Sequence, residues 1–173
     1  MTIIDTPRLR LRPWGDTDAP ALFELARDPR IGMLCGWKPY ECIDDAHSAL
    51  STFLAAPDSY AVTLASTGEI AGSIALRIDT GSPEATVADI GYWIGAPYWG
   101  NGYATEAGNA IIDRARELGV QIIVLKYFDG NDASRRVSEK LGFAWQSRDE
   151  DVEYPLIGKR LTVHRTELVL AGH

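Results

Sequence analysis

The chain has 173 residues, of which 46% are hydrophobic and 24% charged, and its formal net charge is −7. This size and composition fit a single domain spanning 1–173 with a core of its own. The negative charge argues against nucleic-acid binding, which needs clustered Lys and Arg, and no apolar run approaches the ~20 residues that cross a bilayer, so we expect neither a nucleic-acid nor a membrane partner.

The two cysteines, Cys35 and Cys42, are separated by six residues. This spacing fits neither a redox Cys-x-x-Cys pair nor a zinc site. The N-terminus also lacks a signal-peptide core. Free, buried thiols fit a reducing compartment best, and we therefore expect a cytoplasmic protein.

In the first part of the chain, the pattern predicts a strand followed by two helices. Residues 8–12 alternate Arg and Leu with period two, which is typical of a strand, and the arginines form either a binding stripe or a solvated face. A helix is expected over 16–28, where Pro29 should end it. Residues 30–42 show no periodic pattern. A second, amphipathic helix is expected over 43–54.

The rest of the chain alternates strands with two further helices. Strand-like runs occur at 60–65, 70–78, 86–94, 120–128, 143–147 and 160–169. Helical periods cover 104–118 and 131–141, each followed by a glycine in the usual C-terminal position. A hairpin turn is expected at 66–69 and a loop through 81–83. This order of elements indicates an α/β domain with a mixed sheet.

The stretch 90–104 carries the clearest chemical signal. A run with strand propensity breaks at a proline, and Gly100-Asn101-Gly102 then opens a helix. Free N–H groups and the positive dipole end make such a helix start an anion site, and glycine lets its backbone approach a phosphate closely. We therefore expect a phosphorylated ligand on 100–105. The alternative is a tight strand–helix turn without a ligand.

Two common phosphate motifs do not match this stretch. A P-loop needs Gly-Lys-Ser/Thr, whereas Gly102 is followed by Tyr103. The dinucleotide fingerprint needs a third small residue at the position where Thr105 stands. The ligand is therefore of another kind.

The string Tyr-Trp-Gly-Asn-Gly-Tyr-Ala-Thr-Glu-Ala at 98–107 resembles the acetyl-CoA loop of the GNAT N-acetyltransferase superfamily, in particular its RimJ/RimL-like subgroup. Pro97 stands where the superfamily pattern Gln/Arg-x-x-Gly-x-Gly/Ala has Gln or Arg, so the first position departs from the pattern. The segments 6–13, 131–134 and 139–143 are similar to the same subgroup, in the same order. The resemblance therefore covers nearly the whole chain.

This resemblance implies one domain of the α/β (α+β) class, with a mixed, mostly antiparallel sheet of about seven strands flanked by about four helices. The strand that ends at Ile94 would splay from the strand over 120–128, and the pantetheine arm of acetyl-CoA would lie in the gap. The pyrophosphate would meet the N–H groups of 100–105. The residues expected to bind the cofactor are then Trp93, Ile94, Trp99, Gly100, Asn101, Gly102, Tyr103, Ala104, Thr105 and Asn131.

Acetyl transfer from a thioester to an amine needs a deprotonated amine, a stabilised oxyanion and a proton for the departing thiolate. The resemblance implies that Ser134 occupies the place of the serine that RimL-like enzymes use as acid, although it also fits an ordinary first-turn hydroxyl. Ser138 stands where other members carry a thiol-protonating tyrosine. A backbone N–H of the splayed strand could serve the oxyanion. Asn131 could both cap its helix and face the arm.

Two carboxylates compete for the role of base. Glu153, followed by Tyr154, resembles an acidic–aromatic pair of RimL-like enzymes, and its alternative is a solvated loop carboxylate. Asp89 lies on the central strand, where other members of the superfamily place a base. His164 is expected to be structural, and His47 has no identifiable partner. No cluster has metal-ligand spacing, so we expect no catalytic metal.

We therefore expect an acetyl-CoA-dependent N-acetyltransferase acting on a primary amine of a protein N-terminus or a small molecule. A CoA-binding regulatory module without turnover and an unrelated nucleotide-phosphate binder remain alternatives. No motif identifies the acceptor, which residues 30–45 and 146–160 should select. The acidic cluster at 149–151, together with Glu153, favours a cationic amine, and its alternative is a solvated acidic loop that only aids solubility. The sequence is compatible with a homodimer.

Overall fold

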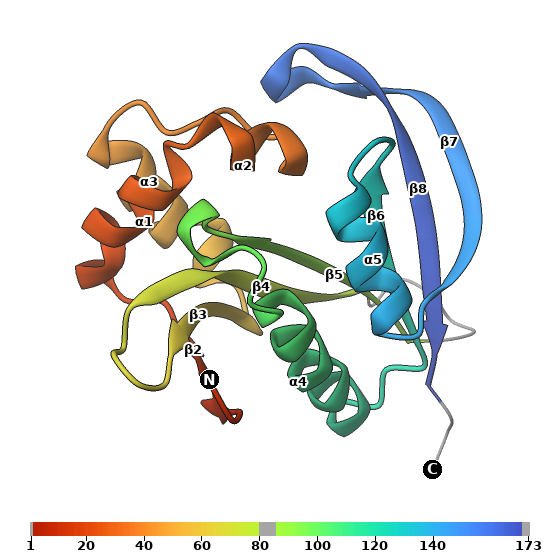
Figure 1. Ribbon diagram of the computed structural model, residues 1–173, viewed down its shortest axis with the longest axis horizontal. Coiled ribbons are helices and arrows are strands. Elements are labelled where there is room, and N and C mark those ends of the chain that lie inside the picture. The colour runs from red at the N-terminus through yellow and green to blue at the C-terminus, as the bar shows by residue number, and fades with distance from the viewer. Residues whose placement is uncertain (1, 80–85, 171–173) are drawn as a thin grey trace.

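A sheet of eight strands runs through the computed structural model, which describes residues 2–79 and 86–170 (Figure 1). The loop expected through 81–83 lies outside the described residues. In spatial order the strands are β1 (Ile4–Asp5), β2 (Leu9–Pro13), β3 (Ser59–Leu64), β4 (Ile70–Asp79), β5 (Val87–Ile94), β6 (Ile122–Phe128), β8 (Lys159–Val169) and β7 (Ala144–Tyr154). All neighbouring strands are antiparallel except β5 and β6, which are parallel.

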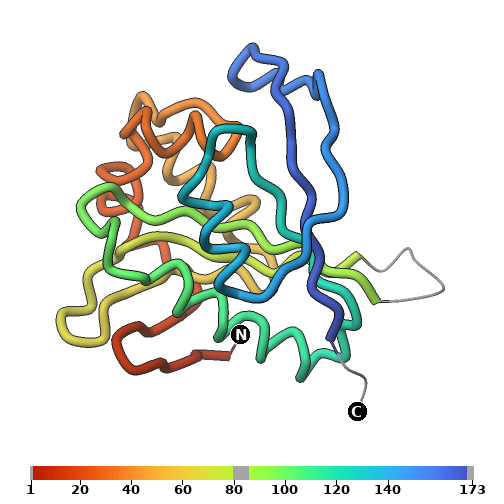
Figure 2. Tube along the Cα trace, turned by 45° about the vertical axis from the view of Figure 1, so that its right-hand side comes forward, coloured from red at the N-terminus to blue at the C-terminus, as the bar shows by residue number. Residues whose placement is uncertain are grey.

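Helices cover both faces of this sheet (Figure 1; Figure 2). They are α1 (Ala19–Ala26), α2 (Pro29–Cys35), α3 (Ile43–Ser51), α4 (Tyr103–Glu117) and α5 (Asp132–Lys140). The expected mixed α/β domain is confirmed, with one strand and one helix more than the sequence indicated. Within the described residues, no helix has the length and apolar character needed to cross a bilayer.

The main core lies between the sheet and α4 with α5. Strand alternation sends Leu76 and Ile90 to this face, where they pack with Ile111 of α4. Full burial of each such side chain stabilises the fold by roughly 1.5–3 kcal/mol. A second cluster on the opposite face joins α1 and α3 to Trp37 and Trp93. The two clusters therefore hold helices on both sides of β5.

Three arginines in β2 and directly before it form ion pairs. Arg8, Arg10 and Arg12 pair with Glu106, Asp5 and Asp18, respectively, at 2.6–2.7 Å. Arg12 also anchors the turn before α1, because the carboxylate of Asp18 accepts from the Gly15 backbone N–H at 2.9 Å.

Two expectations from the sequence were wrong. Residues 30–42 are not all irregular, because α2 begins at Pro29, directly after Asp28, whose carboxylate accepts from the Arg30 N–H at 2.9 Å. Pro29 thus follows one helix and occupies the first turn of the next. The strand expected over 143–147 is longer, because β7 extends through an exposed, bulged segment that lacks apolar alternation.

The feature that positions the site is the divergence of β5 from β6. The two strands pair only over Val87–Ile90 and Ile122–Leu125. Beyond these residues β5 remains paired with β4 as far as Ile94, and β6 remains paired with β8 as far as Phe128. The splayed strand pair expected from the sequence is therefore present.

Candidate active site

One end of the site is the loop before α4. Gly100 and Gly102 have φ values of +79° and +78°, a conformation that favours glycine. The Glu106 N–H donates to the Gly102 carbonyl at 3.0 Å, so the N–H groups of the first helical turn before it have no helical acceptor. These free donors and the helix dipole are the features that the predicted anion site requires, and the site itself remains a prediction.

A partly exposed brace holds this loop against the segment that precedes β2. The Glu106 carboxylate accepts from Thr6 Oγ1 at 2.6 Å, from the Arg8 N–H at 2.8 Å and from Arg8 Nε at 2.7 Å. Arg8 also donates to the Asn101 carbonyl at 2.9 Å. Burial acts to raise the pKa of Glu106, but the hydrogen bonds from Thr6 and Arg8 outweigh it, so this pKa lies below its ordinary value.

The middle of the site is the gap between β5 and β6. The Gly95 N–H points to β4, where it donates to the Ala71 carbonyl at 2.8 Å. Because backbone groups alternate along a strand, the N–H groups of Ile94 and Tyr92 point the other way, into the gap. The Ile94 carbonyl accepts from the Trp99 indole at 2.6 Å.

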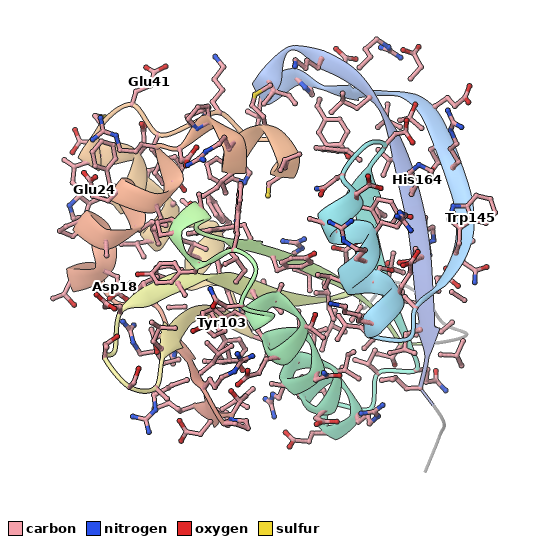
Figure 3. All side chains as sticks on the ribbon, in the orientation of Figure 1. Asp18, Glu24, Glu41, Tyr103, Trp145 and His164 are labelled. Atoms are coloured by element: carbon pink, nitrogen blue, oxygen red, sulfur yellow. The ribbon has the colours of Figure 1, made fainter. Side chains whose placement is uncertain are left out.

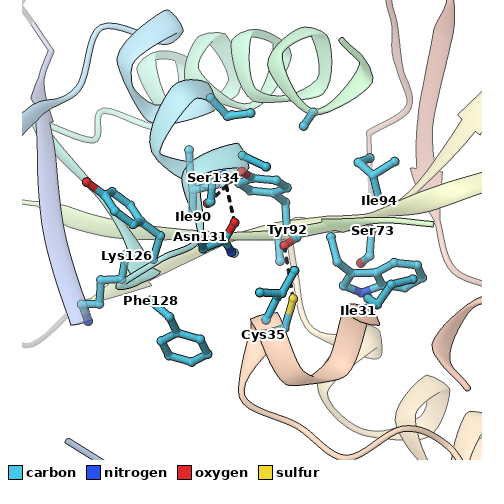
Figure 4. Close-up of a pocket in the computed structure, with 18 of the residues that line it drawn as sticks. Ile31, Cys35, Ser73, Ile90, Tyr92, Ile94, Lys126, Phe128, Asn131 and Ser134 are labelled. Atoms are coloured by element: carbon cyan, nitrogen blue, oxygen red, sulfur yellow. Dashed lines mark hydrogen bonds between the residues drawn. The ribbon is translucent and has the colours of Figure 1, made fainter. Parts of the chain in front are cut away.

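A pair of hydroxyl groups closes the α5 side of the gap (Figure 4). Tyr92 Oη and Ser134 Oγ lie 2.9 Å apart, and the Ser134 N–H donates to Asn131 Oδ1 at 3.1 Å, which caps α5. Burial raises the pKa of Tyr92 to about 12. The tyrosine therefore stays protonated at neutral pH and can donate to the serine.

A cavity of about 930 Å³ passes through the gap and opens on both sides of β5. This volume lies within the ~300–1,000 Å³ of typical small-molecule sites. Its charged lining residues are the cations Arg77, Lys126, Arg136 and Lys140 and, within the described chain, the single carboxylate of Asp89. The cavity is thus positive in a protein whose net charge is −7.

The cavity brings together most of the residues that the sequence predicted. Its lining includes Asp89, Trp93, Ile94, Trp99, Gly100, Gly102, Tyr103, Ala104, Thr105, Asn131 and Ser134. Asn101 instead stabilises the loop, where its amide donates to the Tyr98 and Trp99 carbonyls at 3.0 and 3.2 Å.

The two candidate bases lie in different environments. Asp89 lines the cavity and is held by Arg77 Nη2 at 3.0 Å and Lys126 Nζ at 3.5 Å. Glu153 lies on the outer part of β7 with 68% of its side chain exposed, 3.6 Å from Arg160, and is not among the described residues that line the cavity. Its neighbour Tyr154 does line the cavity.

None of the remaining candidates is among the described residues that line the cavity. His164 stacks on Tyr127, its Nδ1 accepts from the Trp145 indole at 3.2 Å, and its Nε2 lies 2.8 Å from Asp129; Figure 3 places His164 and Trp145 together on the hairpin. Ser138 is buried against Thr166 at 3.0 Å. His47 is exposed. No group of three or more His, Cys, Asp or Glu among the described residues could hold a metal ion.

Sequence reasoning missed three participants in this cavity. The sequence predicts Tyr92 only as part of a strand, because its hydroxyl contacts Ser134 only in the folded chain. Arg77 and Lys126 come from different strands, and only the register with Asp89 reveals them as a cluster. Cys35 was expected to be buried and free, and it lines the cavity as a free thiol, with burial raising its pKa to about 12. Cys42 is free but exposed.

Comparisons with known proteins agree with this geometry. The sequence matches the family described as acetyltransferase (GNAT) domain over residues 8–144. The uncharacterized N-acetyltransferase YoaA of Bacillus subtilis is 30% identical over 147 residues, 82% of each chain. A GNAT-family acetyltransferase from Bacillus anthracis superposes with a TM-score of 0.85 at 20% identity, covering 97% of this chain and 98% of that one. RimL, a ribosomal L7/L12 alpha-N-protein acetyltransferase solved with coenzyme A, gives a TM-score of 0.84 at 20% identity over 98% of both chains.

Proposed function

The chain belongs to the GNAT acetyltransferase family, and on this basis we propose that it transfers the acetyl group of acetyl-CoA to a primary amine inside the cavity between β5 and β6. The observation that carries the proposal is the continuity of this cavity. It joins the free N–H groups at the start of α4 to the hydroxyl pair of Tyr92 and Ser134. A phosphate group and a thioester of one ligand can therefore be held at the same time.

In this proposal the pyrophosphate of acetyl-CoA binds the loop and first turn at 100–105. Arg136 and Lys140 lie on α5 and supply positive charge on the same side of the cavity. The pantetheine arm lies between the diverging strands, where backbone groups of β5 are available. The N–H of Tyr92 or Ile94 then stabilises the oxyanion of the tetrahedral intermediate, because both donors face the gap.

We assign the base to Asp89 ahead of Glu153. An alkyl ammonium has a pKa near ~10.4 and must lose a proton before it can attack. Asp89 lines the cavity next to the splayed strand, whereas Glu153 is mostly exposed. The amine proton passes to the carboxylate, directly or through water, as the nitrogen bonds to the carbonyl carbon.

Ser134 assists the departing thiolate. When the carbon–sulfur bond breaks, the electron pair stays on sulfur, which then takes up a proton. A serine hydroxyl is a weak acid. In this proposal Tyr92 is the donor of the two hydroxyl groups, which leaves the serine proton free to point into the gap. The pair thus stabilises the thiolate by a polarised hydrogen bond.

Acetyl-CoA turnover with a panel of primary amines tests this function. Thiol release should depend on an amine and should match the N-acetyl product in amount. A CoA-binding module would instead bind CoA without amine-dependent release. A nucleotide binder would be stabilised more by ATP or NAD than by CoA, and either result would contradict the proposal.

A further inference from the structure

We propose that the acceptor is a small α-amino acid with an apolar side chain, whose carboxylate is bound by Arg77 and Lys126. This inference rests on the proposed function and names the substrate class of the same cavity. It starts from the part of the cavity on the sheet face opposite to α4, which the acetyl-CoA site does not use.

The floor of this part is a row of small residues across three strands. Ser59 pairs with Ala75 of β4, and Ala75 pairs with Gly91 of β5, so the three side-chain positions lie next to one another on one face. All three line the cavity. Since none carries a large side chain, the sheet leaves room for a ligand at this point.

One group on this floor lacks a hydrogen-bond partner. Ser59 is only 1% exposed, and its Oγ has no hydrogen-bond partner within the described chain. A buried hydroxyl without a hydrogen-bond partner is unfavourable. Ser59 also lines the cavity, so its hydroxyl is a polar position on the floor.

The polar end of the floor carries excess positive charge. The guanidinium of Arg77 lies across Gly91, where an added Cβ would come within 2.6 Å of Nη2. Arg77 and Lys126 share the one carboxylate of Asp89, at 3.0 and 3.5 Å. Two cations therefore face a single anion. Among the described residues, the Arg77 side chain donates to Asp89 through one of its five N–H groups. A carboxylate is the ligand that such a cluster binds best.

The other end of the floor is apolar. Ile31 of α2, Trp37 and Trp93 line it, and the two indole rings meet edge to face with their centroids 6.4 Å apart. Phe53 and Leu34 add exposed apolar surface, at 63% and 43%. An aliphatic or aromatic side chain fits between these walls.

These ends define the acceptor. Its ammonium meets Asp89, which then takes the proton, while its carboxylate meets Arg77 and Lys126 on either side. Gly91 immediately precedes Tyr92, so this zwitterion lies beside the gap that holds the thioester. The apolar side chain extends toward Trp37.

The acidic cluster at 149–151 lies on β7 and does not line this site. From this cluster the sequence predicted a cationic amine as acceptor. Glu150 pairs with Arg148 at 3.3 Å and Asp151 pairs with Arg160 at 2.6 Å. None of the cluster's residues is among the described cavity-lining residues. Its charge is largely compensated where it stands.

The test compares leucine and phenylalanine with their amides and their decarboxylated amines, by kcat/KM for N-acetyl product formed with acetyl-CoA. We expect the free amino acids to be preferred at least about tenfold, the effect of one hydrogen-bonded charge pair. An amide lowers the basicity of its amine and leaves more of it deprotonated, so amine basicity cannot create a preference over the amides. The decarboxylated amines are more basic than the amino acids, so the comparison with the amides is the decisive one.

Arg77→Ala should abolish the preference, because it should lower kcat/KM at least about tenfold more on the free amino acids than on the amides and amines. The matched control is Arg165→Ala, which removes an ion-paired arginine that is not among the described cavity-lining residues. Arg165→Ala should change neither the preference for the free amino acids nor the rates on the amides and amines. Equal loss on all substrates in Arg77→Ala would overturn the assignment, because it would mean that Arg77 only positions Asp89.

Wild-type protein that binds CoA but prefers the amides or amines, or acetylates none of the panel, overturns the substrate class. Protein that does not bind CoA contradicts the proposed function itself.

Discussion

Replacing Gly100 by valine should separate the anion-binding role of the α4 loop from its role in the fold. The matched control is Gly119→Val, at the other end of α4. Gly100 and Gly119 have φ values of +79° and +73°, and an added Cβ would meet nothing within 4 Å at either position. The two substitutions therefore impose the same backbone strain, but only Gly100 lines the cavity.

The expected magnitudes follow from this matching. A side chain at positive φ costs about 1–2 kcal/mol, and more when it is β-branched. For a domain of this size, each kcal/mol lowers Tm by about 2–4 °C. Both variants should thus melt several degrees below the wild type. CoA at about 100 times its Kd stabilises a protein by ~2.7 kcal/mol, or roughly 5–11 °C.

Differential scanning fluorimetry with and without CoA measures both effects. The wild type and Gly119→Val should gain the full shift, whereas Gly100→Val should gain almost none, because its isopropyl group occupies the space where the pyrophosphate approaches the backbone. An equal CoA shift in Gly100→Val and Gly119→Val would refute the assignment of the loop.

Three further predictions concern the catalytic groups and the brace. Ser134→Ala should lower kcat by about 10²-fold or more and Tyr92→Phe by about tenfold, with KM for acetyl-CoA unchanged in steady-state assays; full activity in Ser134→Ala would remove it from the mechanism. Asp89→Asn should lower kcat far more than Glu153→Gln, and the reverse order would return the role of base to Glu153. Glu106→Gln should destabilise the protein at neutral pH. Because the folded pKa of Glu106 lies below its ordinary 4.5, the carboxylate stabilises the fold above that pH, and this contribution is lost as the pH falls through the folded pKa. Urea unfolding should therefore show the gap to wild type closing in acid, and a gap that persists there would contradict the role of the brace.

Local patterns predicted the parts of the fold that local physics determines. Alternation over 8–12 and strand-like runs further along identified β2 through β5, and the glycine loop identified the start of α4 to within one residue. α2 was missed because Pro29 was expected only to end the preceding helix, whereas it also occupies the first turn of α2. β7 was shortened because its outer half is exposed and has no apolar period to detect.

The candidate site likewise has a part that local sequence predicts and a part that it does not. The loop residues are contiguous, so their chemistry could be read from the chain. Tyr92, Arg77 and Lys126 acquire their roles only through register, since each meets its partner on another element. The ranking of Asp89 and Glu153 likewise depended on burial, which the sequence does not state. Residues joined by long-range pairing are therefore the part that sequence reasoning could not supply.

A crystal structure of this protein with bound CoA tests the central claim most directly. We predict that the pyrophosphate contacts the N–H groups of 100–105, that the pantetheine arm lies between β5 and β6, and that the thiol lies within hydrogen-bond reach of Ser134. CoA bound elsewhere, or in this cavity with its thiol directed away from the Tyr92–Ser134 pair, would contradict the account.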